Sequence, residues 1–169
     1  MTGTLDFDST FTALCMRSGA LLAERRISAP RIVGIQTGGV WLAERLAASL
    51  GIESPIGRLD ISFHRDDFEH AGLHPVVRPS VLPWPVDGAH LLLVDDVLYT
   101  GRTVRAALNE LFDWGRPASV MLAVLIDRGG RELPFAPDAC GARVALPQGA
   151  QIRLRGPEPL TIEEIGTTP

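Results

Sequence analysis

The stretch LLLVDDVLYTGRT, from Leu91 to Thr103, leads from a buried strand into the start of a helix. Its apolar run, LLLV, is typical of a central parallel strand that is covered on both faces. Two adjacent carboxylates, Asp95 and Asp96, follow directly, and Gly101 then stands among hydroxyl side chains. In open α/β sheets, ligands bind outside the carboxyl ends of the strands. These side chains therefore stand where a ligand is expected.

The residue types in this stretch predict a phosphorylated sugar as the ligand. A helix that begins after Gly101 offers free backbone N–H groups and a positive dipole end, which favour a phosphate. Thr100 and Thr103 add hydroxyl donors. Asp95 and Asp96 would repel a phosphate but suit sugar hydroxyls, and a divalent cation could lie nearby. The letters VDD alone are as compatible with a structural role as with a ligand site. The whole stretch of thirteen residues is much less compatible with a purely structural role.

The rest of the chain alternates between helical and strand patterns. Helices are expected over residues 10–26, over 40–50 and from Val104 to near Gly115. Strands are expected at Arg31–Gln36, Arg58–Phe63, Leu91–Val94 and Ser119–Ile126, with the letters ARVAL and QIRLR as short edge strands. This order predicts one α/β domain over residues 1–169, built on a mainly parallel sheet.

Composition excludes several classes of protein. The chain has 169 residues and a net charge of −4, and all 16 of its basic residues are arginine. A P-loop NTPase or a response-regulator receiver would need a lysine, and the hydrolase motif GxSxG is absent. No apolar run is long enough for a membrane span. Cys15 and Cys140 are far apart in sequence and are interpreted as buried thiols of a cytoplasmic protein.

Longer motifs resemble a known family. The letters LLLVDDVLYTGRTVRAAL resemble the motif with which type I phosphoribosyltransferases bind phosphoribosyl diphosphate (PRPP). The stretches VLYTGRTVRAAL, GRPASVMLAVLIDRGGRELP and RLDISFHRDD resemble the bifunctional pyrimidine-operon attenuator/uracil phosphoribosyltransferase family. The similarity runs from the first helix to about Gly141. It implies the type I phosphoribosyltransferase fold, an α/β fold with helices on both faces of a mainly parallel central sheet and a small hood.

The resemblance also implies an activity and its partners. Such an enzyme makes UMP and diphosphate from uracil and PRPP. Its Mg²⁺ is bound mainly through PRPP, with no metal site built from side chains alone. The resemblance further implies a homodimer or a higher homo-oligomer.

Residue roles carry over by position. Asp95 and Asp96 would hold the ribose hydroxyls, and Arg65 would begin a flexible loop that closes over the reacting centre. The 5-phosphate would be wrapped by Val97, Leu98, Tyr99, Thr100, Gly101, Arg102 and Thr103. The pyrophosphate loop would be Thr37, Gly38 and Gly39, and the base pocket would contain Asp127, Arg128 and Arg131.

Two positions depart from the family pattern. An arginine is usual where Gly38 stands, and a histidine is usual where Gly130 stands. Arg65 or Arg78 could replace the missing positive charge at the diphosphate. The second departure would affect the base pocket or a surface for RNA.

The segment His64–Asp87 lacks apolar periodicity and is longer than a structural connection needs. It is predicted to be a lid that becomes ordered around PRPP and that could seal through Val81, Leu82 and Trp84. The alternatives are a β-hairpin with an ordered tip and, for Trp84, simple packing, which is the better match. His70 and His74, with Glu69 nearby, are compatible with a metal site. A solvated mobile segment is the better interpretation of these residues. Trp41 and Trp114 are expected in the core or at an interface.

Three functions remain open from the sequence. The first is the uracil phosphoribosyltransferase, with or without a role as regulator of pyrimidine biosynthesis. The second is an RNA-binding transcription attenuator that senses UMP. The third is a nucleotide-binding regulator without catalysis. The acidic charge balance and the absence of lysine argue against strong RNA binding.

Overall fold

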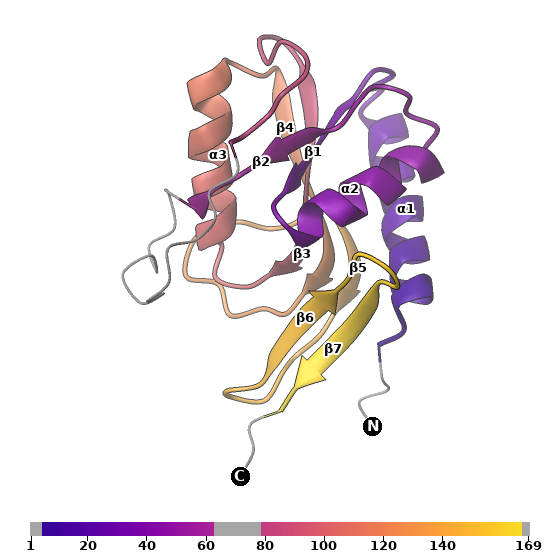
Figure 1. Cartoon of the computed structure of the whole chain (residues 1–169), viewed down its shortest axis with the longest axis vertical. Coiled ribbons are helices and arrows are strands. Elements are labelled where there is room, and N and C mark those ends of the chain that lie inside the picture. Colours follow the sequence, from indigo (N-terminus) through magenta and orange to yellow (C-terminus); the bar gives the residue numbers. More distant parts are fainter. Residues whose placement is uncertain (1–4, 63–78, 167–169) are drawn as a thin grey trace.

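The computed structural model describes residues 5–62 and 79–166 of the chain. A five-stranded parallel sheet with the order β2-β1-β3-β4-β5 forms its centre (Figure 1). Its strands are β1 (Arg31–Ile35), β2 (Gly57–Leu59), β3 (His90–Leu98), β4 (Ser119–Asp127) and β5 (Ala139–Arg143). The helices are α1 (Phe7–Glu24), α2 (Gly38–Ser49) and α3 (Arg102–Trp114). The predicted parallel α/β architecture is confirmed.

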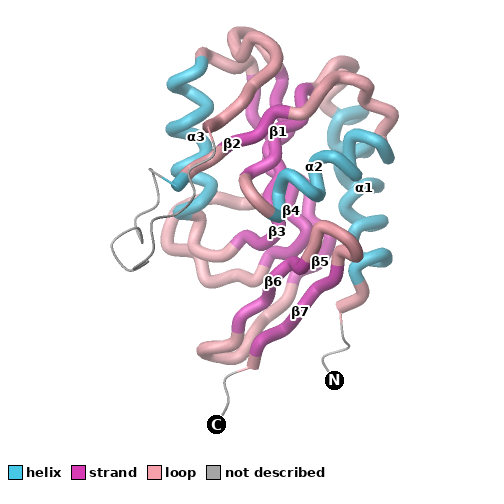
Figure 2. The backbone as a smooth tube through the Cα atoms, viewed as in Figure 1, coloured by secondary structure: helices cyan, strands magenta, loops and turns pink. Residues whose placement is uncertain are grey.

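Helices cover both faces of the sheet, with α1 and α2 on one side and α3 on the other (Figure 2). The side chains of β3 are shared between two separate cores. Leu92 and Val94 pack with α1 and α2, whereas Leu91 and Leu93 pack with α3. All four are fully buried, as the continuous apolar run of this central strand predicts.

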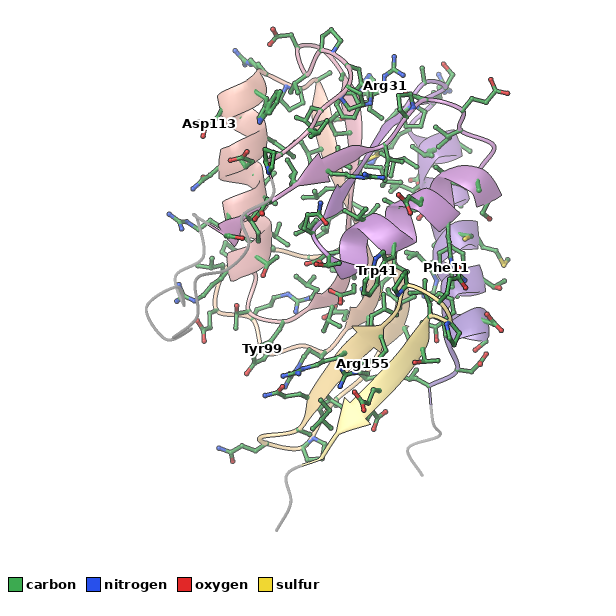
Figure 3. All side chains as sticks on the ribbon, in the orientation of Figure 1. Phe11, Arg31, Trp41, Tyr99, Asp113 and Arg155 are labelled. Atoms are coloured by element: carbon green, nitrogen blue, oxygen red, sulfur yellow. The ribbon has the colours of Figure 1, made fainter. Side chains whose placement is uncertain are left out.

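A small antiparallel ribbon, β6 (Gln151–Arg155) and β7 (Thr161–Ile165), lies beyond the carboxyl ends of the central strands (Figure 1). Ile152 and Leu154 of β6 are buried in the same core as α1 and α2. Trp41 of α2 lies directly above the ribbon (Figure 3), and a Cβ atom at Gly156 would lie 2.8 Å from its ring. The ribbon is thus packed onto the sheet at the end where a ligand is expected, and it occupies the position of the expected hood.

Local hydrogen bonds move several boundaries away from the predicted ones. Helix α1 begins earlier than predicted because Asp6 caps it and accepts a hydrogen bond from Ser9 N at 2.8 Å. Strand β2 is shorter than predicted because the chain turns at Asp60, whose carboxylate accepts the N–H of Ser62 at 2.9 Å. The ARVAL segment contributes only its first two residues to β5, and β7 was not predicted from the sequence.

The predicted lid is partly wrong. Val81 exchanges two backbone hydrogen bonds of 2.8 Å with Arg58, and Leu82 and Trp84 are buried in the core beside α3. The side chains of Leu82 and Trp84 are therefore not available to seal a closing loop, whereas that of Val81 is 52% exposed. The remaining predictions for this segment, at Arg65, Glu69, His70, His74 and Arg78, lie outside the described residues.

Other single-residue predictions are confirmed in part. Cys140 is buried, as expected, and burial raises the pKa of its thiol. Cys15 is only partly buried, and both thiols are free. Trp41 packs against the core, whereas Trp114 is 47% exposed and does not belong to it. None of the described helices has the length and apolar character that crossing a bilayer requires.

Candidate functional site

The predicted pyrophosphate loop forms the start of α2, where it is pressed onto the carboxyl end of β3. A Cβ atom at Gly39 would lie 2.4 Å from the carbonyl oxygen of Val94, so only glycine allows this approach. A Cβ atom at Gly38 would lie 2.6 Å from Oδ2 of Asp96. The two glycines therefore place the first turn of α2 directly beside the acidic pair. Thr37, the N-cap residue, is exposed.

The two adjacent carboxylates differ in environment. Asp95 is 5% exposed, and its Oδ1 accepts a hydrogen bond from Asp96 N at 3.0 Å. Asp96 is only partly buried, and its Oδ1 accepts from Val97 N at 2.9 Å. Within the described part of the chain, no donor reaches Oδ2 of Asp96. Asp96 thus keeps an accessible acceptor beside the start of α2, while Asp95 supports it from the interior.

The predicted phosphate loop leads from β3 into α3. Gly101 is the N-cap residue with φ 93° and has no side chain to cap the helix, and Oγ1 of Thr100 accepts from Arg102 N only at a long 3.3 Å. A Cβ atom at this position would also lie 3.0 Å from the ring of Phe135. The N-terminal backbone groups of a 13-residue helix are thereby left for an anion. Val97 and Leu98 are still part of β3, and Leu98 is buried, so they shape the loop from below.

A segment that sequence reasoning did not assign to the site, residues 132–135, lies on the outside of the phosphate loop. The N–H groups of Glu132 and Leu133 both donate to the carbonyl oxygen of Thr100, at 2.9 and 3.0 Å. The Glu132 carboxylate also accepts from Nε of Arg102 at 2.7 Å. The loop is therefore held by a second strip of chain. The only signal in the sequence is that the letters RELP belong to the family-like stretch.

Two of the three predicted base-pocket residues are bound to each other. Nη2 of Arg131 donates to Oδ1 of Asp127 at 2.6 Å, and this oxygen also accepts from Gly129 N at 3.0 Å. The remaining hydrogen bonds of Arg131 go to carbonyl oxygens, those of Tyr99, Gly129 and Phe135. Both side chains thus shape the 128–131 turn.

The third base-pocket residue, Arg128, connects three parts of the site. Its guanidinium carbon lies 3.9 Å from the centre of the Tyr99 ring, and its Nη2 donates to the carbonyl oxygen of Ala150 at 3.0 Å. Its Nε is buried and finds no acceptor among the described residues. The Tyr99 ring also touches Gly130, where a Cβ atom would lie only 2.4 Å from it. Glycine at this position thus makes room for this ring, which is seen at the lower left of Figure 3.

The structure therefore brings the predicted groups together in a chain of contacts. Gly38 touches Asp96, Asp96 leads through Val97 into the phosphate loop, and Tyr99 of that loop stacks on Arg128. Across residues 5–62 and 79–166, no three His, Cys, Asp or Glu side chains come together as a metal site. Arg65, the third predicted catalytic residue, lies outside the described residues.

Comparisons of the sequence identify relatives along most of the chain. The model of the phosphoribosyl transferase domain family matches residues 14–140. The protein named bifunctional protein PyrR in Pseudomonas paraeruginosa is 60% identical over 144 residues, which are 85% of each chain. The protein of the same name in Pseudomonas entomophila is 57% identical over 150 residues, covering 89% of this chain and 87% of the relative.

Solved structures agree on the fold. A hypoxanthine phosphoribosyltransferase from Staphylococcus aureus superposes with a TM-score of 0.64 at 18% identity, covering 89% of this chain and 81% of that one. The corresponding enzyme from Trypanosoma cruzi gives a TM-score of 0.60 at 21% identity. These findings confirm the predicted type I phosphoribosyltransferase fold, the enzyme class and the family resemblance. The chain belongs to the phosphoribosyl transferase domain family and, within it, to the group of bacterial proteins named bifunctional protein PyrR.

Proposed function

We propose that the protein makes UMP and diphosphate from uracil and PRPP. One observation carries this proposal: an accessible carboxylate, that of Asp96, stands between the start of α2 and the uncapped start of α3. PRPP carries a diphosphate and a 5-phosphate on either side of its ribose hydroxyls. Backbone N–H groups at the start of α2 and of α3 would bind the two phosphate-containing groups, and the carboxylate of Asp96 between them would bind the hydroxyls.

In this proposal the chain mainly positions its substrates. Asp96 accepts hydrogen bonds from the ribose hydroxyls, and Asp95 holds the backbone of Asp96 in place. The residues from Tyr99 to Thr103 bind the 5-phosphate through their N–H and hydroxyl groups. The Thr37–Gly39 turn binds the diphosphate as it leaves, so that negative charge develops at the N-terminus of a helix.

The donor set of the site fits the Mg²⁺ that is proposed to accompany PRPP. Oxygen ligands suit this ion, and Oδ2 of Asp96 receives no hydrogen bond from a described residue. Asp96 would therefore hold it together with oxygens of PRPP. The ion would supply charge neutralisation at the leaving diphosphate.

The uracil is proposed to lie over the 128–131 turn. Asp127 and Arg131 fix the shape of this turn, and Arg128 contributes the cationic face beside Tyr99. Gly129 and Gly130 are exposed. The backbone of Gly129 is already engaged by Asp127 and Arg131, so Gly130 is the residue proposed to offer its backbone groups to the edge of a base. We propose Arg65 as the cation that approaches from the other side.

A base-by-base assay tests the function. Diphosphate release is followed with PRPP and Mg²⁺ and with uracil, hypoxanthine, guanine, adenine or orotate as the acceptor. We expect turnover with uracil and at least tenfold lower kcat/KM with each other base. Comparable turnover with a purine or with orotate would reject uracil as the substrate, and no turnover with any base would favour a nucleotide-binding regulator.

A regulatory role in pyrimidine biosynthesis is proposed as the second function. The relatives are named bifunctional proteins, and the same site would let UMP report on the pyrimidine supply. UMP contains the ribose, the 5-phosphate and the base but no diphosphate, so its binding would use Asp96, the phosphate loop and the 128–131 turn.

A further inference from the structure

The guanidinium group of Arg131 is committed to four acceptors of the protein itself. Its Nε donates to the carbonyl oxygen of Phe135 at 2.8 Å, and its Nη1 donates to those of Tyr99 at 2.8 Å and Gly129 at 3.3 Å. Its Nη2 completes the set at Asp127. An arginine has five N–H donors, so almost its whole capacity is used. This leaves little with which it could read a base.

The four acceptors belong to different parts of the site. Asp127 ends β4, Gly129 lies in the turn proposed to meet the base, and Tyr99 lies in the phosphate loop. Phe135 belongs to the segment that packs on Gly101, the N-cap of α3. One planar group thus joins the turn after β4 to the loop after β3. The ion pair is mostly shielded, with 23% of the Arg131 side chain and 12% of the Asp127 side chain exposed.

The phosphate loop needs such support from outside. Its N-cap residue, Gly101, has no side chain with which to cap α3, and the contact from Arg102 N to Oγ1 of Thr100 is long, at 3.3 Å. A phosphate is bound by N–H groups only when several of them point at one place. The carbonyl group of Tyr99 sets the plane of the next peptide, so its hydrogen bond to Arg131 helps to aim these groups.

We propose that Arg131 is a positioning residue for the phosphate loop, rather than a residue that contacts the base. Its planar fork holds the carbonyl groups of Tyr99 and Phe135 at fixed places relative to Asp127. The 5-phosphate then meets N–H groups that are already oriented. The set of hydrogen bonds from Arg131 to Asp127 and to the three carbonyl groups is called the brace. This inference rests on the proposed function for the identity of the phosphate, but not for the existence of the brace.

The brace itself can be observed without any activity. Tyr99 is the only tyrosine of the chain, so protein labelled with tyrosine carrying ¹³C at its carbonyl carbon gives a single protein signal. This signal reports on the hydrogen bond from Nη1 of Arg131. We expect Arg131→Ala and Arg131→Lys to shift it. Arg155→Ala, which removes an exposed ion pair with Glu163 in the ribbon, is the matched control and should leave it unchanged.

Binding then shows whether the brace positions the loop. Ribose 5-phosphate is titrated into each labelled protein, and KM for PRPP and kcat are measured alongside. We expect Arg131→Ala and Arg131→Lys to weaken ribose 5-phosphate binding and raise KM for PRPP by about tenfold or more, with a smaller change in kcat. Lysine keeps the charge beside Asp127 but cannot donate to the carbonyl oxygens in one plane, so it should behave like alanine.

Three results would overturn the proposal. Lysine with wild-type affinity would mean that charge, not the planar fork, is what counts. A shifted Tyr99 signal with unchanged affinities, accompanied only by a lower unfolding temperature, would leave Arg131 a purely structural residue. A rise in KM for uracil alone would return it to the base pocket. If the wild-type protein binds neither ribose 5-phosphate nor PRPP, the proposed function fails instead, and the Tyr99 signal still tests the brace.

Discussion

At the scale of single residues, the acidic pair divides its work between an interior and an exterior position. Asp95 is buried, and its Oδ1 accepts a hydrogen bond from the backbone N–H of Asp96. Oδ2 of Asp96 lies beside Gly38. Adjacent residues in a sequence motif therefore have different environments that the motif does not reveal. The more accessible carboxylate is the one expected to contact PRPP.

Replacement of Asp96 by Asn should lower kcat/KM for PRPP by about 10- to 100-fold, since a hydrogen bond to a charged group contributes about 1.5–3 kcal/mol. The double change with Asp95→Asn should nearly abolish transfer. Asp113→Asn, at an exposed position near the far end of α3 (Figure 3), is the control. Steady-state kinetics measure the loss of kcat/KM, and circular dichroism shows whether each variant is folded. A folded double variant with near wild-type turnover would remove both acids from the site.

Gly130 and Gly129 allow a test of the space beside Tyr99. Both have φ 71°, but a Cβ atom meets the Tyr99 ring only at Gly130 and meets nothing within 4 Å at Gly129. Each change to alanine should cost about 1–3 kcal/mol of backbone strain. Only Gly130→Ala should also displace the ring from Arg128.

Urea unfolding measures the shared cost, and the ring signals of ¹³C-labelled tyrosine measure the displacement. Gly130→His, which places a larger side chain against the ring, should move the ring further. Identical Tyr99 ring signals in the Gly129 and Gly130 variants would show that the ring does not depend on this glycine.

At the scale of elements, apolar spacing was a good guide to helices and central strands and a poor guide to their ends. The long run in β3 and the helix faces were recognised because burial acts on every residue of them. The early start of α1 depends instead on one capping carboxylate, Asp6, and the end of β2 depends on the turn at Asp60. The polar residues of β7, in the letters TIEEI, alternate too weakly to predict a strand, which forms by pairing with β6.

The capping carboxylate of α1 gives a pH-dependent contribution to stability. Hydrogen bonds from the backbone and side chain of Ser9 lower the pKa of Asp6 below its ordinary value of 3.8. The stabilisation is therefore fully present above pH 3.8 and is lost as the pH falls through the lowered pKa of the folded state. Asp6→Ala should lower the melting temperature by about 2–4 °C at pH 7.

The difference in melting temperature between Asp6→Ala and the wild type should narrow as the pH falls below 3.8. Asp8→Ala, in the same first turn but without the capping role, is the matched control. A difference that stays constant from pH 7 down to the lowest measurable pH would exclude the charge of Asp6 as its cause.

At the scale of the whole molecule, the sequence predicted where the site would form but not how its parts are held together. Asp95, Asp96 and the phosphate loop follow from one contiguous stretch. The contacts of Arg131 and the segment 132–135 with that loop join residues about 30 positions apart, and no local pattern encodes them. They result from two neighbouring strands, β3 and β4, ending at the same edge of the sheet. The resemblance placed Arg131 near the base, whereas its hydrogen bonds place it between two loops.

The charge of the whole molecule predicts its behaviour toward RNA. The net charge is −4, and no lysine is present. Within the described part of the chain, these arginines lie in ion pairs with carboxylates: Arg25, Arg45, Arg58, Arg102, Arg131, Arg143 and Arg155. An arginine that already has a carboxylate partner gives up that pairing when it binds a phosphate, which at an exposed site subtracts up to about 1 kcal/mol from its gain.

We therefore expect weak or absent binding to the leader RNA of the protein's own operon at physiological salt, with or without UMP. For single strands, log K falls by about 0.7 per tenfold rise in salt for each neutralised phosphate, so a few contacts would be visible only at low salt. Fluorescence anisotropy with the leader RNA, across a salt series and beside a shuffled RNA of equal length, measures this. A UMP-stimulated complex of submicromolar affinity that discriminates against the shuffled RNA would contradict the expectation. The regulatory role would then act through RNA rather than through the nucleotide alone.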